Sequence, residues 1–173
     1  MNRILIIGTS GCGKSTLAKR VSERLQIPFF PSDEFYWEPR WKIATQDKVH
    51  RLVWNIVYQD TWILDGNFDE IHDLVWRRAD CIIWLDYPLL TIFGQILTRN
   101  FRWVLTRQKI WSGNTMTLQR AISGIHHMVN SYSQKKKKYP FWLSEIPNIV
   151  CHRFRARDET EMWFENITKK EGN

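Results

Sequence analysis

The sequence lacks any apolar run of the roughly 18 residues that a membrane span requires. Its first apolar run, residues 4–7, is too short for the apolar core of a secretion signal. The three cysteines, Cys12, Cys81 and Cys151, are odd in number and show no C-x-x-C spacing. These absences predict reduced thiols in a cytoplasmic protein without a membrane partner.

Signatures of several other protein classes are also missing. No Asn-Lys-x-Asp sequence for reading guanine occurs, which argues against a GTPase switch. His126 and His127 have no cysteine or acid at metal-ligand spacing, so they predict no zinc site. With 173 residues the chain fits one domain over residues 1–173 and is too short for a large ATPase motor.

Acidic residues are scarce in the second half of the chain. Residues 1–90 hold 11 basic and 12 acidic side chains, whereas residues 91–173 hold 14 and 6. Such an excess of positive charge attracts polyanions, so nucleotide phosphates and nucleic acids are both candidates. Direct binding of nucleic acid is the less favoured alternative, supported by the aromatic and basic sequence Phe101-Arg102-Trp103.

Short apolar runs alternate with helical patterns along the chain. Strands are expected at residues 4–7, 27–30, 62–64, 81–85 and 149–151. Helices are expected after the first strand and at residues 46–59, 69–77, 89–105, about 115–134 and 159–168. This order predicts an α/β fold, a parallel sheet with helices on both faces. The basic tract 135–138 is interpreted as the solvated end of a helix that stops before Pro140.

The chemistry is indicated by residues 8–15, which match the phosphate-binding pattern G-x-x-x-x-G-K-[ST] without a mismatch. The motif follows a predicted strand and precedes a predicted helix, as its function requires. Its glycines let several backbone N–H groups point at one anion, and the helix adds its positive end. The expected nucleotide-binding residues are Gly8, Thr9, Ser10, Gly11, Cys12, Gly13, Lys14, Ser15 and Thr16. Lys14 would hold the β- and γ-phosphates, and Ser15 would ligate Mg²⁺.

Polar sequences follow the next three strands: Ser32-Asp33, Asp65-Gly66-Asn67 and Asp86-Tyr87-Pro88. Together with the phosphate loop, they resemble the small kinases related to adenylate kinase, and most closely the bacterial group named topology modulation proteins. The resemblance implies a P-loop NTPase fold of three α/β/α layers, with five parallel strands in the order 2-3-1-4-5. It also implies a helical lid, which falls here at about residues 99–120.

The same resemblance implies an enzyme that uses ATP and Mg²⁺. Its expected reaction is transfer of the γ-phosphoryl group to a small acceptor, with a nucleotide or nucleoside as the first choice. The alternative function is that of an ATP-dependent regulatory protein that associates with nucleic acid and affects DNA topology.

Three acids end predicted strands, and each has two interpretations. Asp65 is expected to hold Mg²⁺ beside Ser15, although an aspartate before Gly66 also fits a plain turn. Asp33 is expected on the acceptor side as a catalytic carboxylate, and its alternative is a helix cap. Asp86 is the second choice for the metal, and it too fits a turn.

Arginines supply the remaining predicted contacts. Arg99 and Arg102 lie three residues apart on one helical face and are expected to close over the transferred phosphoryl group. The resemblance implies that Arg99, the first of them, also lies on the nucleotide base. It further implies that Arg155, with Arg157 beside it, follows the fifth strand where related kinases hold adenine.

Overall fold

The centre of the structure is a parallel sheet in which the first strand of the chain lies in the middle. The computed structural model describes residues 1–146 and 148–167. Strand β1 pairs in parallel with β5 on one side and with β6 on the other. The full order is β2-β5-β1-β6-β9, which is 2-3-1-4-5 when only these five strands are counted. The predicted α/β class and strand order are confirmed.

The five strands of the sheet are β1 (Arg3–Gly8), β2 (Phe29–Pro31), β5 (Trp62–Asp65), β6 (Cys81–Leu85) and β9 (Val150–Phe154). Two short antiparallel pairs lie outside it, β3 (Trp37–Glu38) with β4 (Lys42–Ile43), and β7 (Lys109–Ile110) with β8 (Asn114–Thr115). The sequence did not predict either pair. Both are too short to give an alternating pattern of apolar and polar residues.

The helices are α1 (Lys14–Leu25), α2 (Ser32–Tyr36), α3 (Gln46–Val57), α4 (His72–Arg78), α5 (Leu89–Thr106), α6 (Leu118–Ser144) and α7 (Arg157–Asn166). Single 3-10 turns are η1 (Pro39–Trp41) and η2 (Asp69–Ile71). Within residues 1–146 and 148–167, no helix has both the length and the hydrophobicity needed to cross a bilayer. The predicted residue Thr168 of the last helix lies outside the described residues.

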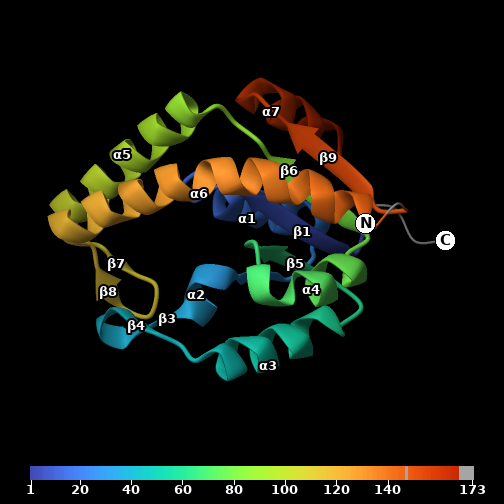
Figure 1. Cartoon of the computed structure of the whole chain (residues 1–173), viewed down its shortest axis with the longest axis horizontal. Helices are drawn as coiled ribbons and strands as arrows, with labels where there is room; N and C mark the ends of the chain where they lie inside the picture. Colours follow the sequence, from blue (N-terminus) through green and yellow to red (C-terminus); the bar gives the residue numbers. More distant parts are fainter. Residues whose placement is uncertain (147, 168–173) are drawn as a thin grey trace.

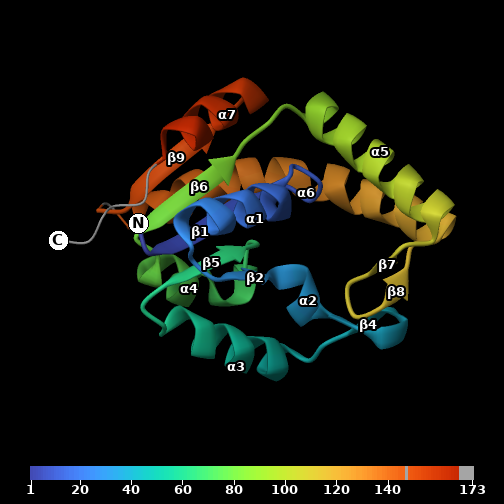
Figure 2. The same ribbon diagram turned by 180° about the vertical axis from the view of Figure 1, so that it is seen from behind.

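Helices cover both faces of the sheet. Because successive residues of a strand point to opposite faces, each strand contributes side chains to both layers. Ile4 and Ile6 of β1 pack in one cluster with residues of α1 and α7. Leu5 and Ile7 pack in a second cluster with residues of α3, α4 and the end of α6. Figures 1 and 2 show the sheet between these two layers. The continuous apolar run in β1 therefore follows from burial on both faces.

Helix α6 corrects one prediction. It continues well beyond the expected end at residue 134, so the tract 135–138 is not a helix end and Pro140 lies inside the helix. A proline removes one helical hydrogen bond because it has no N–H. Two nearby side chains, Tyr139 just before it and Trp142 two residues after it, are buried, Tyr139 against Trp84 of β6 and Trp142 against Trp76 of α4. Packing of these two rings stabilises the helical turns around Pro140, which helix propensity alone would disfavour.

Aromatic side chains fill the space between the sheet and the end of α6. The Trp76 ring lies 5.7 Å from Tyr139 and 5.3 Å from Trp142 between centroids. Trp84, on β6, lies 5.5 Å from Tyr139 in an edge-to-face contact. Such aromatic pairs add about 0.5–1.5 kcal/mol each beyond the area that they bury. Packing in this cluster accounts for three of the ten tryptophans of the chain, Trp76, Trp84 and Trp142.

Replacing Trp76 by alanine is therefore expected to lower the free energy of unfolding by about 3–5 kcal/mol, the usual cost of removing a buried aromatic ring. Trp54, also on a helix but half exposed, is the matched control, and Trp54→Ala should cost about 1 kcal/mol or less. Urea unfolding followed by circular dichroism measures both. Equal losses in the two variants would contradict the packing described for Trp76.

Candidate active site

The loop between β1 and α1 curves around a point at the carboxyl edge of the sheet. Gly8, Gly11 and Gly13 have φ angles of +149°, +84° and +99°, which side chains other than glycine rarely adopt. A Cβ atom on Gly8 would also lie 2.7 Å from the carbonyl oxygen of Leu85. The shape of the backbone therefore requires the glycines of the motif.

The two polar residues that end the motif lie inside this loop and beside it. Lys14 Nζ donates to the carbonyl oxygens of Gly8 at 3.1 Å and Thr9 at 3.2 Å. Ser15 Oγ donates to Oδ2 of Asp65. The other oxygen of Asp65 accepts the backbone N–H of Ser32 at 2.8 Å, and the residue is only 2% exposed. One buried carboxylate thus joins the ends of β5 and β2 to the first turn of α1.

The pair of Ser15 and Asp65 fits a magnesium ion. A hydroxyl and a carboxylate are the hard oxygen ligands that Mg²⁺ prefers, usually with several water molecules retained. The pair lies beside the loop whose lysine marks the phosphate position. These two residues would hold the ion between the protein and a bound phosphate.

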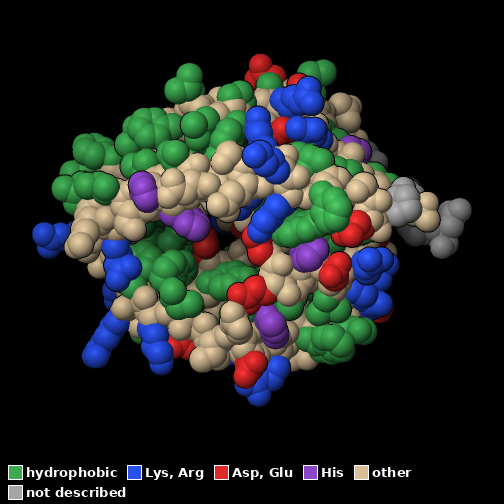
Figure 3. Space-filling view, in the orientation of Figure 1, with side chains coloured by type: hydrophobic (Ala, Val, Ile, Leu, Met, Phe, Trp, Pro, Cys, Tyr) green, Lys and Arg blue, Asp and Glu red, His purple; other side chains and the backbone are tan. Residues whose placement is uncertain are grey.

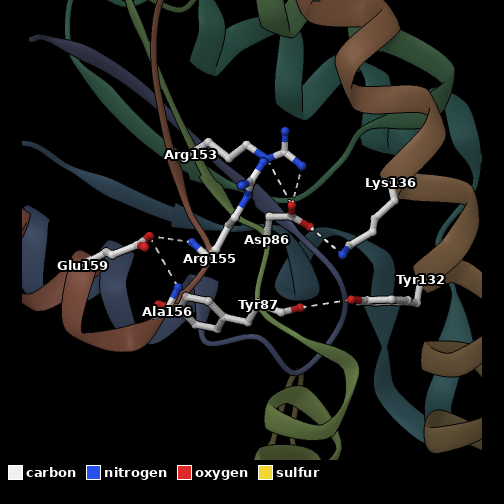
Figure 4. A network of polar contacts seen from close by, with 8 residues as sticks. All are labelled: Asp86, Tyr87, Tyr132, Lys136, Arg153, Arg155, Ala156 and Glu159. Atoms are coloured by element: carbon white, nitrogen blue, oxygen red, sulfur yellow. Dashed lines mark hydrogen bonds and ion pairs between the residues drawn. The ribbon is translucent and has the colours of Figure 1, made fainter.

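Asp86, the alternative ligand, is surrounded by cations. Nε and a terminal nitrogen of Arg153 donate to its Oδ2 at 3.0 and 2.6 Å, and Lys136 Nζ lies 3.7 Å from its Oδ1 (Figure 4). Asp86 is buried and is not among the residues that line the cleft beside the phosphate loop. Its geometry is that of an ion-pair centre that joins β6, β9 and α6.

Asp33 lies in α2, directly after β2, and lines the same cleft as the phosphate loop. Burial raises the pKa of its carboxyl group to about 6, and the charge of Asp65 adds to the rise. Lys14 and Arg99 oppose the rise because their positive charges favour the ionised form. A carboxylate with such a pKa is suited to accept a proton near neutral pH.

The predicted arginines divide into those that line the cleft and one that does not. Arg99 and Arg102 project into it from α5, and burial lowers the pKa of the Arg99 guanidinium. Arg157 also lines the cleft. With the Gln95 amide oriented to satisfy both neighbours, its oxygen accepts from Arg157 at 2.6 and 2.8 Å and its nitrogen donates to the Gly11 carbonyl.

Arg155 is exposed and is not part of that lining. Its backbone N–H donates to Oε2 of Glu159 at 2.7 Å, which caps the start of α7 (Figure 4). The placement therefore favours Arg157 over Arg155 as the arginine near a bound nucleotide.

Sequence reasoning missed Lys135, which reaches the phosphate loop from α6. Burial and the charge of Lys14 lower the pKa of its ammonium group to about 8. Asn67 connects the two elements: with its amide oxygen toward Lys135 it accepts from Nζ at 2.7 Å, and its nitrogen donates to the Gly8 carbonyl at 3.2 Å. The sequence does contain a signal for the position of Lys135. Side chains on one side of a helix recur at steps of three or four residues, and this spacing joins Met128, Tyr132, Lys135, Tyr139 and Trp142.

The site opens into a cleft of about 1700 Å³ that extends from the phosphate loop to two hairpins. Figure 3 shows the hollow near the middle of this face. Its lining also includes Asp33 and Tyr36 of α2, Trp103 of α5 and Trp111 of the β7–β8 turn. Polar and aromatic groups thus face each other across a space large enough for two small ligands.

The two hairpins hold each other across this end of the cleft. Asn114 Oδ1 accepts the Trp41 backbone N–H at 2.8 Å, and its Nδ2 donates to the Glu38 carbonyl at 3.0 Å. The rings of Trp37, Trp41, Trp111 and Trp103 form a chain of edge-to-face contacts, with centroid distances of 5.2, 5.9 and 5.4 Å. Residues 109–115 and 37–43 therefore close one side of the site as a unit.

Comparison with known sequences gives a partial match. A model of the family described as "ATPase family associated with various cellular activities (AAA)" matches residues 4–86, the part of the chain that contains the phosphate loop and Asp65. A search of curated proteins finds no match. The narrower resemblance to the topology modulation proteins stays a prediction.

Comparison with solved structures covers nearly the whole chain. A shikimate kinase from Acinetobacter baumannii in complex with shikimate is similar with a TM-score of 0.58 and 11% identity, over 95% of this chain and 89% of that one. A shikimate kinase from Bacteroides thetaiotaomicron gives 0.53 and 16%, over 95% and 94%. A gluconokinase from Sinorhizobium meliloti 1021 gives 0.53 and 12%, over 96% and 98%. The chain therefore has the P-loop NTPase fold that these small kinases share.

Proposed function

We propose that this protein is an ATP- and Mg²⁺-dependent kinase that transfers the γ-phosphoryl group of ATP to a small-molecule acceptor. One observation carries the proposal. Lys14, Ser15 and Asp65 meet at one end of a cleft, and Asp33 and Arg99 line the same cleft, where the Asp33 carboxyl group is near the charges of Lys14, Asp65 and Arg99. A nucleotide switch needs only the first group, whereas a phosphotransferase needs both. The structural likeness to solved small-molecule kinases supports the same reaction class.

The residues of the chain divide the work of phosphoryl transfer. The N–H groups of the phosphate loop and Lys14 bind and orient the β- and γ-phosphates. When bound, Mg²⁺ would neutralise phosphate charge between Ser15 and Asp65. Arg99 and Arg102 balance the charge that develops on the transferred group. Asp33 accepts the proton of the acceptor hydroxyl as the new bond to phosphorus forms.

The class of acceptor is proposed from the side chains that line the cleft near the β7–β8 hairpin. Trp111 offers an aromatic ring against which a nucleobase can stack, and Arg102 offers positive charge for a phosphate. The Trp103 ring already carries the Arg99 guanidinium, 4.5 Å from its centroid. A nucleotide or nucleoside therefore remains the first choice of acceptor. Residues 99–120, which hold the β7–β8 hairpin, are proposed to act as the lid that excludes water during transfer.

The nucleic-acid alternative loses much of its support from the positions of the basic residues. Arg153 and Lys136 pair with Asp86, and Lys138 Nζ lies 3.4 Å from Asp69. Arg99 and Lys135 face the cleft rather than an open surface. Part of the positive charge of the second half therefore serves the cleft or is paired with acids, and is not available to a nucleic acid.

An acceptor screen tests the proposed function. Purified protein with Mg²⁺ and γ-labelled ATP should transfer label to at least one member of a panel of nucleosides, nucleoside monophosphates and small hydroxy compounds. Lys14→Ala should abolish transfer and weaken ATP binding while retaining the circular dichroism spectrum. Transfer at an unchanged rate in that variant would contradict the role of the loop.

Variants of the two buried acids, Asp65 and Asp86, distinguish a metal-binding role from a structural one. Asp65→Asn should abolish both acceptor transfer and slow ATP hydrolysis and should change their dependence on Mg²⁺ concentration. Asp86→Asn should keep its Mg²⁺ dependence and lose stability, because it leaves Arg153 with a weaker partner. Steady-state rates over a Mg²⁺ series, with urea unfolding, measure both effects. If Asp86→Asn changes the Mg²⁺ dependence and Asp65→Asn does not, the metal ligand is Asp86 rather than Asp65.

The raised pKa of Asp33 predicts two pH effects. Acceptor transfer should rise with pH through about 6, and Asp33→Asn should lose about 10²- to 10⁴-fold in transfer rate but keep ATP binding. Because the folded state holds this proton more tightly than the unfolded chain, the group lowers stability as pH rises from about 4 to about 6. Asp33→Asn should therefore be more stable than the wild type at pH 8, by up to about 3 kcal/mol.

Urea unfolding at pH 5 and pH 8 tests the stability effect, because the difference between the two proteins should grow with pH. A constant difference at both pH values would contradict the burial of this carboxylate.

A further inference from the structure

Helix α5 carries a row of exposed apolar side chains on the surface of the molecule. They recur at steps of three or four residues, which places them along one side of the helix. Leu90 is 85% exposed, Phe101 67% and Leu105 65%. Two residues from the start of α6 adjoin the C-terminal half of this row, where α5 and α6 pack together through Asn100 and Ala121. The α5 face, as it is called below, consists of Leu90, Phe93, Leu97, Phe101, Leu105, Leu118 and Ile122.

The size of the α5 face is unusual for the free surface of a monomer. Its seven side chains are 38–85% exposed. At about 150–250 Å² for a large side chain they expose on the order of 700 Å², whereas the largest apolar patch on a typical monomer is about 300–600 Å². Figure 3 shows these hydrophobic side chains gathered over the end of the molecule that α5 forms in Figure 1. Two such faces would together bury at most about 1,400 Å², and a standard stable interface buries ~1,200–2,000 Å².

The charge of the face favours a second copy of the same chain. The only charged residues within α5 are Arg99 and Arg102, and both line the cleft, so no charge of this helix interrupts the apolar row. In a two-fold interface each residue near the axis meets its own copy, so a charge there would meet a like charge. An uncharged face avoids this repulsion, and it offers no charge by which a different partner would be selected.

Pairing through this face would leave the cleft open. An α-helix turns by about 100° per residue, so Gln95, Arg99 and Arg102 fall on the side of α5 opposite the centre of the apolar row. Leu90, at the N-terminal end of the row, is the one member that also borders the cleft. Leu105 lies shortly before β7 and Leu118 shortly after β8, so a second copy would contact the chain on both sides of that hairpin.

We propose that the protein forms a symmetric homodimer in which the α5 face of one chain packs antiparallel against the same face of the second. The interface is isologous and apolar, with Leu97 and Phe101 nearest the two-fold axis. It does not depend on the kinase activity, and a protein without transferase activity would form it equally well.

Light scattering after size exclusion tests the assembly with the full chain. The expected mass at micromolar concentration is twice the 20.8 kDa of the chain. A monomer over the whole concentration range would overturn the proposal. A monomer that sediments with vesicles of anionic phospholipid, and no longer does so after Leu97→Glu with Phe101→Glu, would assign the α5 face to a membrane surface and would overturn it as well.

Matched variants locate the interface. Leu97→Glu with Phe101→Glu places like charges on the axis and should give a monomer with an unchanged circular dichroism spectrum. Met162→Glu is the control, because Met162 is 65% exposed on α7, away from the α5 face, and it should leave the dimer intact. A double variant that remains dimeric would overturn the assignment of the interface.

Cross-linking provides a test that does not depend on the folding of the charged variant. In a Cys151→Ser background, which removes the one exposed thiol among the three cysteines, Leu97→Cys or Phe101→Cys should form a disulfide-linked dimer under mild oxidation. Met162→Cys should remain monomeric on denaturing gels. Equal cross-linking at all three positions, or cross-linking at Met162→Cys alone, would overturn the proposed geometry.

Discussion

The buried carboxylate of Asp65 is the constraint on which the site depends. Its two oxygens accept hydrogen bonds from Ser15 and from the backbone of Ser32, so it joins three separate strand-to-helix connections at one edge of the sheet. Burial of a carboxylate is costly unless hydrogen bonds compensate it, and here both partners are residues of the site. The same contacts that stabilise the edge of the sheet therefore fix the positions of the phosphate loop and of Asp33.

The end of the cleft away from the loop is organised by packing rather than by charge. Four tryptophans and the Asn114 side chain connect the β7–β8 hairpin to the β3–β4 hairpin. These two segments are distant in sequence, and each is too short to be stable alone. Their mutual contacts stabilise both, which gives a structural account of several of the ten tryptophans.

The sequence predicted the features that depend on local patterns, and it failed where tertiary contacts decide. The strand order, the phosphate loop and the placement of Asp33, Asp65 and Arg99 around one cleft follow from apolar runs, glycine spacing and family resemblance. Helix α6 was expected to stop before Pro140, because propensity favours an end there, yet buried Tyr139 and Trp142 carry it onward. The same error explains why the position of Lys135 was not predicted, since a lysine at a solvated helix end is not expected to face the phosphate loop.

The most direct measurement of the central claim is a crystal structure of the protein with Mg²⁺ and a non-hydrolysable analogue of ATP. The account predicts that Lys14 Nζ leaves the carbonyl oxygens of Gly8 and Thr9 and binds the β- and γ-phosphates. It also predicts that Ser15 Oγ turns from Asp65 to the metal, with Asp65 close to the water molecules of that ion. Phosphates bound away from the loop, or Lys14 still held by the two carbonyl groups, would contradict it.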